Sequence, residues 1–286
     1  MPLLAIVLLL TSAFMHALWN LILKQSEIKN VAMNWQVLLG GAAAIIAMFF
    51  LGLPPRALWS FVIVSAVLEV LYFFLLMYAY TDHDFSLIYP VARGAAPALV
   101  VIWAALFLWE IPTKGGLIGI ALIVVGLVII GATSLLNNLD NKPQLKGIAL
   151  ALGVAFIISV YTIVDGFAVK QYPEAALPYA LSMFILVPFM TTPVVVRKYG
   201  WGAFAQAWRE QRFRLLLGGV LGVVAYTTAL FAYSFAPLNY SEAIREVSVV
   251  IGAFFGWKFI GEKMGGYRLV GALVIFAGII LIALMG

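Results

Sequence analysis

The stretch YSEAIREVSVV, residues 240–250, places three charged side chains within five positions of a strongly apolar chain. Glu242, Arg245 and Glu246 come first, and apolar or small residues follow almost to Gly261. An ionisable side chain at the centre of a bilayer costs at least about 2.5–3.5 kcal/mol, so such residues usually face a cavity or a charged partner. The surroundings of this stretch therefore decide what kind of protein the sequence encodes.

The composition is that of a membrane protein. Of the 286 residues, 65% are hydrophobic and only 10% are charged, whereas a soluble globular protein carries roughly 25% charged residues. The mean hydropathy is +1.09. Apolar runs long enough for a spanning helix, which needs about 20 residues, recur throughout, and the alternating segments of a β-barrel do not occur. The sequence predicts an all-α polytopic membrane protein.

Short polar connections divide the chain into ten predicted transmembrane helices. The apolar start MPLLAIVLLL lacks a basic segment and a small-residue cleavage site, so we interpret it as a retained first helix. The long connection 197–214 is basic and aromatic, and it predicts either a segment at the membrane surface or a solvated connector. The ten predicted spans are 2–23, 31–52, 58–80, 85–108, 115–134, 147–169, 176–196, 214–235, 240–260 and 267–285.

The two halves of the chain resemble each other. A shift of 152 residues places Arg93 on Arg245, Glu110 on Glu262, Gly119 on Gly271 and Gly126 on Gly278. Five helices per half is an odd number, so the second half must run inverted with respect to the first. We predict a first repeat at 1–135, a connection at 136–146 and a second repeat at 147–286. Such repeats are common in secondary transporters, with the site near the bilayer midplane.

Several motifs make the sequence resemble the EamA-type members of the drug/metabolite transporter superfamily over essentially its full length. They are HALWNLILK (16–24), YPVARGAAPALV (89–100), WEIPTKGGLIGIALIVVG (109–126), YTIVDG (161–166), FIGEK (259–263) and GALVIFAGIILI (271–282). The resemblance implies two inverted five-helix repeats around a central cavity lined mostly by helices 1, 3, 4, 6, 8 and 9. Members move amino acids, other metabolites or drugs, so the fold does not determine the substrate.

The orientation in the membrane stays open. An even number of spans puts both termini on one side, and Lys and Arg are concentrated in the loops after spans 1, 5, 7 and 9. That distribution favours a cytoplasmic position for these loops, whereas the resemblance implies cytoplasmic termini. We expect an integral protein of the bacterial inner (cytoplasmic) membrane, with the lipid bilayer as a partner.

Arg93 is the most informative charge in the apolar spans. The nearest carboxylate on its own predicted helix is Asp84, roughly 13 Å away along the axis, so the partner of Arg93 must come from another helix or from a ligand. Glu69, Asp165 and Glu246 are the candidates. A guanidinium group suits a substrate anion, and a static ion pair that locks the repeats together is an equal alternative.

The opening stretch divides into three roles. Asn239 followed three residues later by Glu242 predicts a capping box, which gives Glu242 a structural role at the start of a helix. Glu246 lies one turn deeper, where capping does not explain it. Arg245 can pair with Glu242 at i,i+3 or reach another helix or a substrate. Arg93, Arg245 and Glu246 are therefore candidate substrate-binding residues.

Glu69 and Asp165 are the candidates for proton coupling. Burial favours the neutral form of a carboxyl group and a neighbouring arginine favours the charged form, so substrate and access can switch its protonation. The alternatives are static. Glu69 would be the ion-pair partner of Arg93, and Asp165 would be a carboxylate near the interface, paired with Lys170.

Aromatic and amide side chains complete the predicted binding site. Their rings can stack on a solute or bond to it, although Tyr and Trp are also common at membrane interfaces. The candidates are Trp19, Asn20, Tyr72, Tyr89, Tyr161 and Tyr226. We interpret His16 as a hydrogen-bonding residue in helix packing. The repeated glycine pairs predict close helix packing, either within the bundle or in a homodimer.

Absent motifs exclude several other functions. The sequence has no complete Walker A, Rossmann, HExxH or GxSxG motif and no cysteine. We therefore expect no cofactor, no metal, no nucleic-acid partner and no enzymatic activity, with transport driven by gradients.

The sequence predicts a secondary transporter of a small polar organic metabolite that works by alternating access. Amino acids and related carboxylates are favoured because two arginines suit an anionic group, and efflux is favoured over uptake on the resemblance. The driving ion, protons included, stays open. One alternative is a membrane-embedded enzyme acting on lipid-linked substrates, for which TDHD (81–84) is the loop candidate. The other is a non-transporting scaffold.

Overall fold

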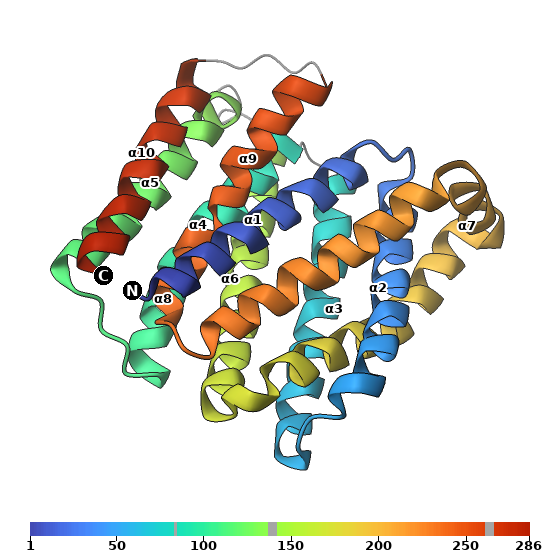
Figure 1. Ribbon diagram of the computed structural model, residues 1–286. Coiled ribbons are helices and arrows are strands. Elements are labelled where there is room, and N and C mark those ends of the chain that lie inside the picture. The colour runs from blue at the N-terminus through green and yellow to red at the C-terminus, as the bar shows by residue number, and fades with distance from the viewer. Residues whose placement is uncertain (83–84, 137–141, 261–265) are drawn as a thin grey trace.

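The computed structural model is a bundle of helices that pack side by side (Figure 1). It describes residues 1–82, 85–136, 142–260 and 266–286. The helices are α1 (Leu3–Lys24), α2 (Lys29–Leu51), η1 (Arg56–Leu58), α3 (Trp59–Asp82), α4 (Phe85–Phe107), α5 (Lys114–Leu136), α6 (Lys142–Gln171), η2 (Pro173–Ala175), α7 (Ala176–Tyr233), α8 (Leu238–Arg245), α9 (Val247–Phe255), the π-helical turn η3 (Gly256–Ile260) and α10 (Gly266–Met285).

The surface of the bundle suits a bilayer. Among the described residues, five helical stretches have the length and composition to cross a membrane, and three shorter apolar helices accompany them. Large apolar side chains point outward, with Phe49 and Phe50 85% and 86% exposed and Leu284 79% exposed. A water-soluble monomer rarely exposes large apolar patches, whereas lipid tails accommodate them. The chain is an integral membrane protein.

The predicted connection 197–214 is helical. Helical structure continues through all of α7, and the backbone departs from helical angles only at Gly200 (φ 78°, ψ 158°) and Gln211 (φ −132°, ψ 15°). The seventh and eighth predicted spans therefore lie on either side of a short helical segment. Glycine adopts the left-handed φ without steric cost, which permits the first bend.

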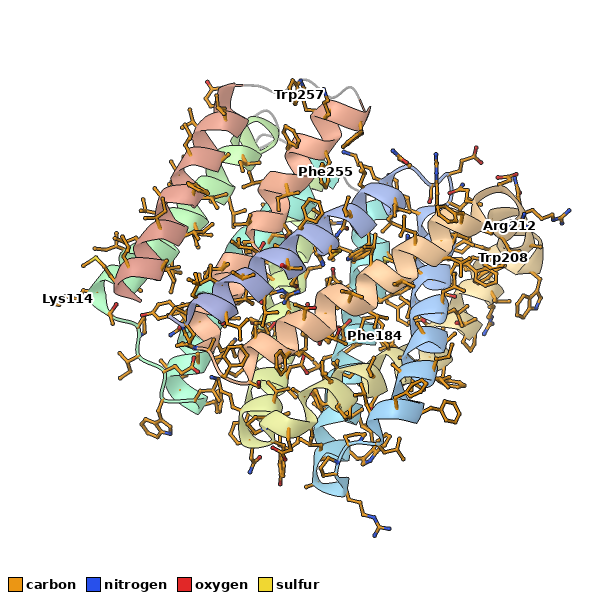
Figure 2. The ribbon with its side chains drawn as sticks, in the orientation of Figure 1. Lys114, Phe184, Trp208, Arg212, Phe255 and Trp257 are labelled. Carbon is orange, nitrogen blue, oxygen red and sulfur yellow. The ribbon has the colours of Figure 1, made fainter. Side chains whose placement is uncertain are left out.

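An aromatic contact fixes this segment to the bundle. The ring of Trp208 stacks on that of Trp35 in α2, with the centroids 4.9 Å apart, and the indole N–H of Trp35 donates to the carbonyl of Phe204. Trp208 and Arg212 lie close together where α7 turns back on itself (Figure 2). The sequence predicts a basic and aromatic segment here but not its helical structure, because the pattern of its apolar residues is short.

The ninth predicted span is interrupted. It divides into α8 and α9 at Glu246, whose backbone N–H donates to the carbonyl of Ala243, three residues back, at 3.2 Å. A tight turn of this kind inside a helix often marks a hinge. The charged residues of the opening stretch therefore lie on a separate helix of eight residues and at the break that follows it.

The last helices of the two halves pack closely. α5 and α10 lie side by side (Figure 1), and their glycines face each other. A Cβ on Gly119 would lie 2.8 Å from the carbonyl oxygen of Gly278, and one on Gly126 would lie 2.7 Å from that of Gly271. The glycine faces therefore pack within the bundle, which is one of the two predicted alternatives. A homodimer through other surfaces stays a prediction.

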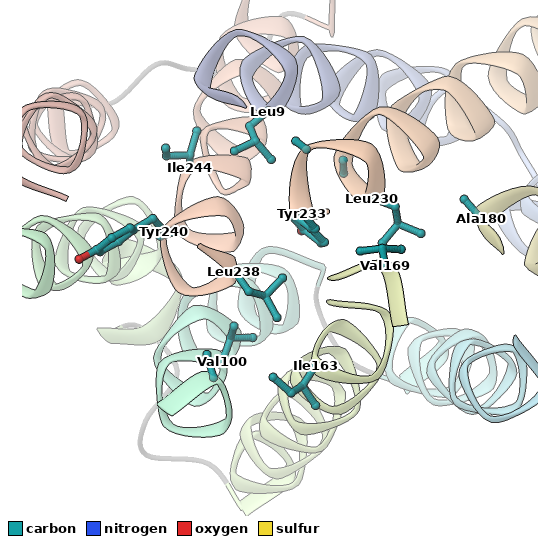
Figure 3. Packing of buried hydrophobic residues seen from close by; sticks show 14 of the residues in the cluster. Leu9, Val100, Ile163, Val169, Ala180, Leu230, Tyr233, Leu238, Tyr240 and Ile244 are labelled. Atoms are coloured by element: carbon teal, nitrogen blue, oxygen red, sulfur yellow. The ribbon is translucent and has the colours of Figure 1, made fainter. Parts of the chain in front are cut away.

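Both termini lie at the same end of the bundle. The ammonium group of Met1 donates to the carbonyl of Gly286 at 3.1 Å. We call this the terminal end, and the opposite end, which holds residues 25–28, the loop end. The largest cluster of buried apolar residues contains Leu9, Val169, Leu230, Leu238 and Tyr233 (Figure 3). Because these residues lie near the terminal ends of their helices, they fill the bundle on that side.

Replacement of Gly126 by alanine tests the close packing of α5 on α10. We expect Gly126→Ala to lower stability by about 1–3 kcal/mol, since an added methyl group forces two backbones apart. Gly252→Ala is the matched control because a Cβ there meets nothing within 4 Å, and we expect it to be neutral or to stabilise by up to about 1 kcal/mol. Thermal unfolding in detergent measures both, and equal midpoints would contradict the packing role.

Candidate functional site

A cavity of about 130 Å³ lies among the helices. This is room for on the order of ten water molecules or one small organic solute. Seven of the residues predicted for substrate binding or proton coupling line the cavity, and they come from both halves of the chain. They are Trp19, Glu69, Tyr72, Arg93, Tyr161, Tyr226 and Arg245.

The cavity lies toward the loop end. Much of its lining comes from the second half of α1, the first turns of α2 and the early part of the last span in α7, which are the parts of these helices farther from the termini. Glu69 of α3 and Tyr161 of α6 lie nearer the middle of their helices. The implied cavity helices 1, 3, 4, 6, 8 and 9 all contribute. Gln36 of α2 and Phe184 of α7 contribute as well, from helices 2 and 7, which the resemblance did not imply.

Arg93 and Glu246 form an ion pair between the two halves. The Nε of Arg93 lies 2.9 Å from Oε2 of Glu246, and the two side chains are 5% and 0% exposed. Nη2 of Arg93 also donates to the hydroxyl of Ser248 at 3.5 Å. The partner of Arg93 was expected from another helix or from a ligand, and the structure shows a partner on another helix, Glu246. Glu246 is buried and does not line the cavity. Its contacts in this structure are therefore structural, and it does not face a substrate in the cavity.

Glu242 does not cap its helix, so the capping-box prediction was wrong. α8 begins after Pro237, which offers no side-chain cap, and Asn239 instead accepts the backbone N–H of Tyr240. The fully buried carboxylate of Glu242 accepts from the hydroxyl of Tyr233 and from Nη1 of Arg245 at 3.0 Å. The capping-box prediction rested on the Asn239–Glu242 spacing alone, which is typical of that motif. The predicted pairing of Arg245 with Glu242 at i,i+3 is confirmed.

Two described side chains, Glu242 and Tyr233, hold the guanidinium group of Arg245. Its Nη1 donates to Glu242 and, at 2.7 Å, to the hydroxyl of Tyr233, and the guanidinium lies 5.8 Å from the centroid of the Tyr233 ring. With the described residues, the hydrogen bonds of Arg245 engage Nη1 alone. Because guanidinium carries five N–H donors, Nε and Nη2 remain for a ligand in the cavity that Arg245 lines.

Asp165 lies behind the cavity wall. Its carboxylate accepts from the hydroxyl of Tyr179 at 2.7 Å and from that of Tyr226, and the residue is 1% exposed. The alternative pairing with Lys170 was wrong, since Lys170 pairs with Glu110 at 2.8 Å. Asp165 thus joins both spans of α7 to α6 and orients Tyr226. Glu69, the other candidate for proton coupling, lines the cavity itself.

The HALWN motif places Trp19 and His16 in the cavity wall. The indole N–H of Trp19 donates to Nδ1 of His16 at 3.2 Å, and the rings meet edge to face at 5.3 Å. His16 thus forms a hydrogen bond, but with Trp19 of its own helix rather than with another helix. Asn20 bonds back to the carbonyl of His16 at 2.8 Å and is not among the described residues that line the cavity. Tyr89 lies outside the residues whose side chains the structure describes.

Gln36 is a cavity residue that sequence reasoning missed. It is 4% exposed, and neither atom of its amide has a hydrogen-bond partner among the described residues. A Cβ on Gly218 would collide with Nε2 of Gln36, so a larger residue there would force the amide to move. The signal available was a pair of amides, Asn34 and Gln36, in the apolar run of α2. An unpaired buried amide is costly, and a bound solute would satisfy it.

Tyr179→Phe tests the role of Asp165 as a structural node. The substitution removes one donor from a buried carboxylate, and we expect a loss of about 1–3 kcal/mol of stability. Tyr267→Phe is the control because Tyr267 is 63% exposed, and surface substitutions usually stay within about 0.5 kcal/mol. Thermal unfolding of the two variants in detergent gives the comparison. A midpoint for Tyr179→Phe equal to that of the control would remove Asp165 from this role.

Comparison with known proteins agrees with this architecture. No curated protein sequence matches the chain. A solved structure titled only "Crystal structure of protein" has a TM-score of 0.77 and 14% identity, over 98% of this chain and 97% of that one, and at this identity the likeness shows the fold alone. The profile of the EamA-like transporter family matches residues 3–132 and 145–284. The chain belongs to the EamA-like transporter family, and it is a membrane transporter of the drug/metabolite superfamily.

Proposed function

We propose that the chain is a secondary transporter of amino acids or related carboxylates, which it moves by alternating access between its two halves. One observation carries the substrate class. The cavity is lined by Arg245, whose Nε and Nη2 are not engaged by the described residues, and by the carboxyl group of Glu69. A guanidinium group binds a carboxylate through parallel N–H donors, and a carboxylate suits the ammonium group of an amino acid.

The remaining lining supports an organic solute rather than a bare ion. Tyr72 and Tyr161 meet edge to face at 6.0 Å, and Phe184 lies against Tyr226 at 5.7 Å. Pockets for small organic molecules are mostly apolar and aromatic, with a few polar groups that set orientation. Gln36 adds an amide donor and an acceptor.

Glu69 is the group that we propose for proton coupling, because it reaches the cavity while Asp165 is sealed behind Tyr226. In this scheme Asp165 acts by holding Tyr226. Export is the proposed direction and the bacterial inner membrane the proposed location, and both rest on the family resemblance.

Flux measurements in proteoliposomes test the proposal. A panel of radiolabelled amino acids and simple carboxylates is screened for saturable uptake, with and without a pH gradient. We expect Arg245→Ala to reduce flux at low substrate at least about tenfold, since a charge-assisted bond is lost. We expect Glu69→Gln to abolish the response to the pH gradient.

Arg56→Ala is the control for flux because Arg56 is exposed at the terminal end. Wild-type flux in both Arg245→Ala and Glu69→Gln would show that the site is wrongly assigned. The absence of flux for every solute in the panel would contradict the substrate class.

A further inference from the structure

The connection between α4 and α5 carries a carboxylate that the cavity does not use. Oε1 of Glu110 lies 2.8 Å from Nζ of Lys170, with the side chains 15% and 25% exposed. Oε2 accepts the backbone N–H of Leu238 at 2.6 Å and lies 3.5 Å from that of Asn239. These are the first two residues of α8, so Glu110 caps this helix from a distant part of the chain, where negative charge is favourable.

The same groups hold four segments together. Nζ of Lys170 also donates to the carbonyl of Ala236 at 2.7 Å, and the side-chain amide of Asn239 donates to the carbonyl of Glu110 at 3.2 Å. The end of α6, the connection 108–113, the turn 234–237 and the start of α8 thus meet at the terminal end. We call Glu110, Lys170, Ala236, Leu238 and Asn239 the terminal latch.

Backbone strain and close packing accompany the latch. Trp109 adopts a left-handed conformation, φ 58°, which is uncommon for a residue other than glycine and persists where the surroundings hold it. Leu238 rests on Gly166 of α6, where an added Cβ would collide with Cδ2 of Leu238. A larger residue at this position would therefore force the side chain of Leu238 to move.

The position of the latch is that of a gate. The latch lies at the terminal end, and the side chains of Leu238 and Tyr233 in the buried cluster lie between it and the cavity. α8 carries Arg245 into the cavity wall, begins at the latch and is separated from α9 at the Glu246 break. All eight residues of α8 are buried, and Leu238, Tyr240, Ala243 and Ile244 belong to the apolar cluster. Because the helix is short, is tied by polar bonds at its start and ends at a break, it can slide on this apolar packing as a unit.

We propose that Glu110 and Lys170 act as positioning residues for transport, holding α8 so that the path is closed at the terminal end. Release of the latch lets α8 move away and opens the cavity to that end while the loop end closes. The proposal rests on the proposed alternating-access transport, and it assigns Glu110, Lys170 and Gly166 to the gate.

Thiol accessibility tests the latch without knowledge of the substrate. The chain has no cysteine, so single thiols report cleanly on the full-length protein in nanodiscs treated with a membrane-impermeant maleimide. Ala243→Cys reports on the terminal side. Ala243 is 0% exposed within α8, so its thiol should react only when α8 moves away from the bundle. Gly222→Cys reports on the cavity, since Gly222 lines it and an added Cβ meets nothing within 4 Å.

We expect Glu110→Gln or Lys170→Met to raise the labelling rate of the Ala243→Cys thiol about tenfold. The same variants should lower the labelling rate of the Gly222→Cys thiol, because more molecules adopt the conformation that is open at the terminal end and closed at the loop end. Gly166→Ala should act in the same direction through sterics. Lys114→Met is the matched control, since it removes an exposed positive charge at the same end (Figure 2), and it should change neither rate.

Opposite changes at the two thiols distinguish a gate from simple loosening. Unchanged labelling of Ala243→Cys in both latch variants, or a parallel rise at both thiols, would overturn the proposal. Either result would leave the flux assay to decide the transport function separately.

Discussion

The ion pair of Arg93 with Glu246 is the interaction that organises the centre of the bundle. It joins α4 of the first half to the break between α8 and α9 in the second half, and both side chains are almost fully buried. Removing one partner of such a pair typically costs about 3–5 kcal/mol, because the other charge is left uncompensated. The pair therefore determines where α8 lies against α4, and with it where Arg245 enters the cavity.

The two arginines that occupy matching positions in the two halves, Arg93 and Arg245, make different contacts. Arg93 is committed through Nε and Nη2 to Glu246 and Ser248, whereas Arg245 is steadied by Glu242 and Tyr233 through Nη1. A buried arginine that keeps donors for a ligand in a cavity is suited to a substrate anion, and one enclosed by a carboxylate is suited to holding helices together. Under the proposed function, Arg93 mainly holds helices together and Arg245 binds the substrate, although both side chains line the cavity.

Much of this architecture could be predicted from the sequence, because apolar runs, glycine spacing and lone charges have strong physical causes. Arg93 had no nearby carboxylate on its helix, so an interhelical partner followed, but choosing Glu246 over Glu69 required the positions of the helices. The role of Glu242 was mistaken because its spacing to Asn239 is that of a capping box. The sequence marked Glu110 only because it aligns with Glu262 in the second half. Its hydrogen bonds to α8 could not be predicted, since they join residues 128 positions apart. Gln36 carries no charge to mark it.

The central claim is that the transported solute occupies the cavity between Arg245 and Glu69. Protection of the Gly222→Cys thiol by substrate, in a chain with no other cysteine, tests this claim. Gly202→Cys is the control on the exposed helical segment of α7. A transported amino acid should slow labelling at Gly222→Cys, with a half-maximal concentration matching that of flux, and leave Gly202→Cys unaffected. Unchanged labelling at Gly222→Cys under saturating transported solute would show that the solute binds elsewhere.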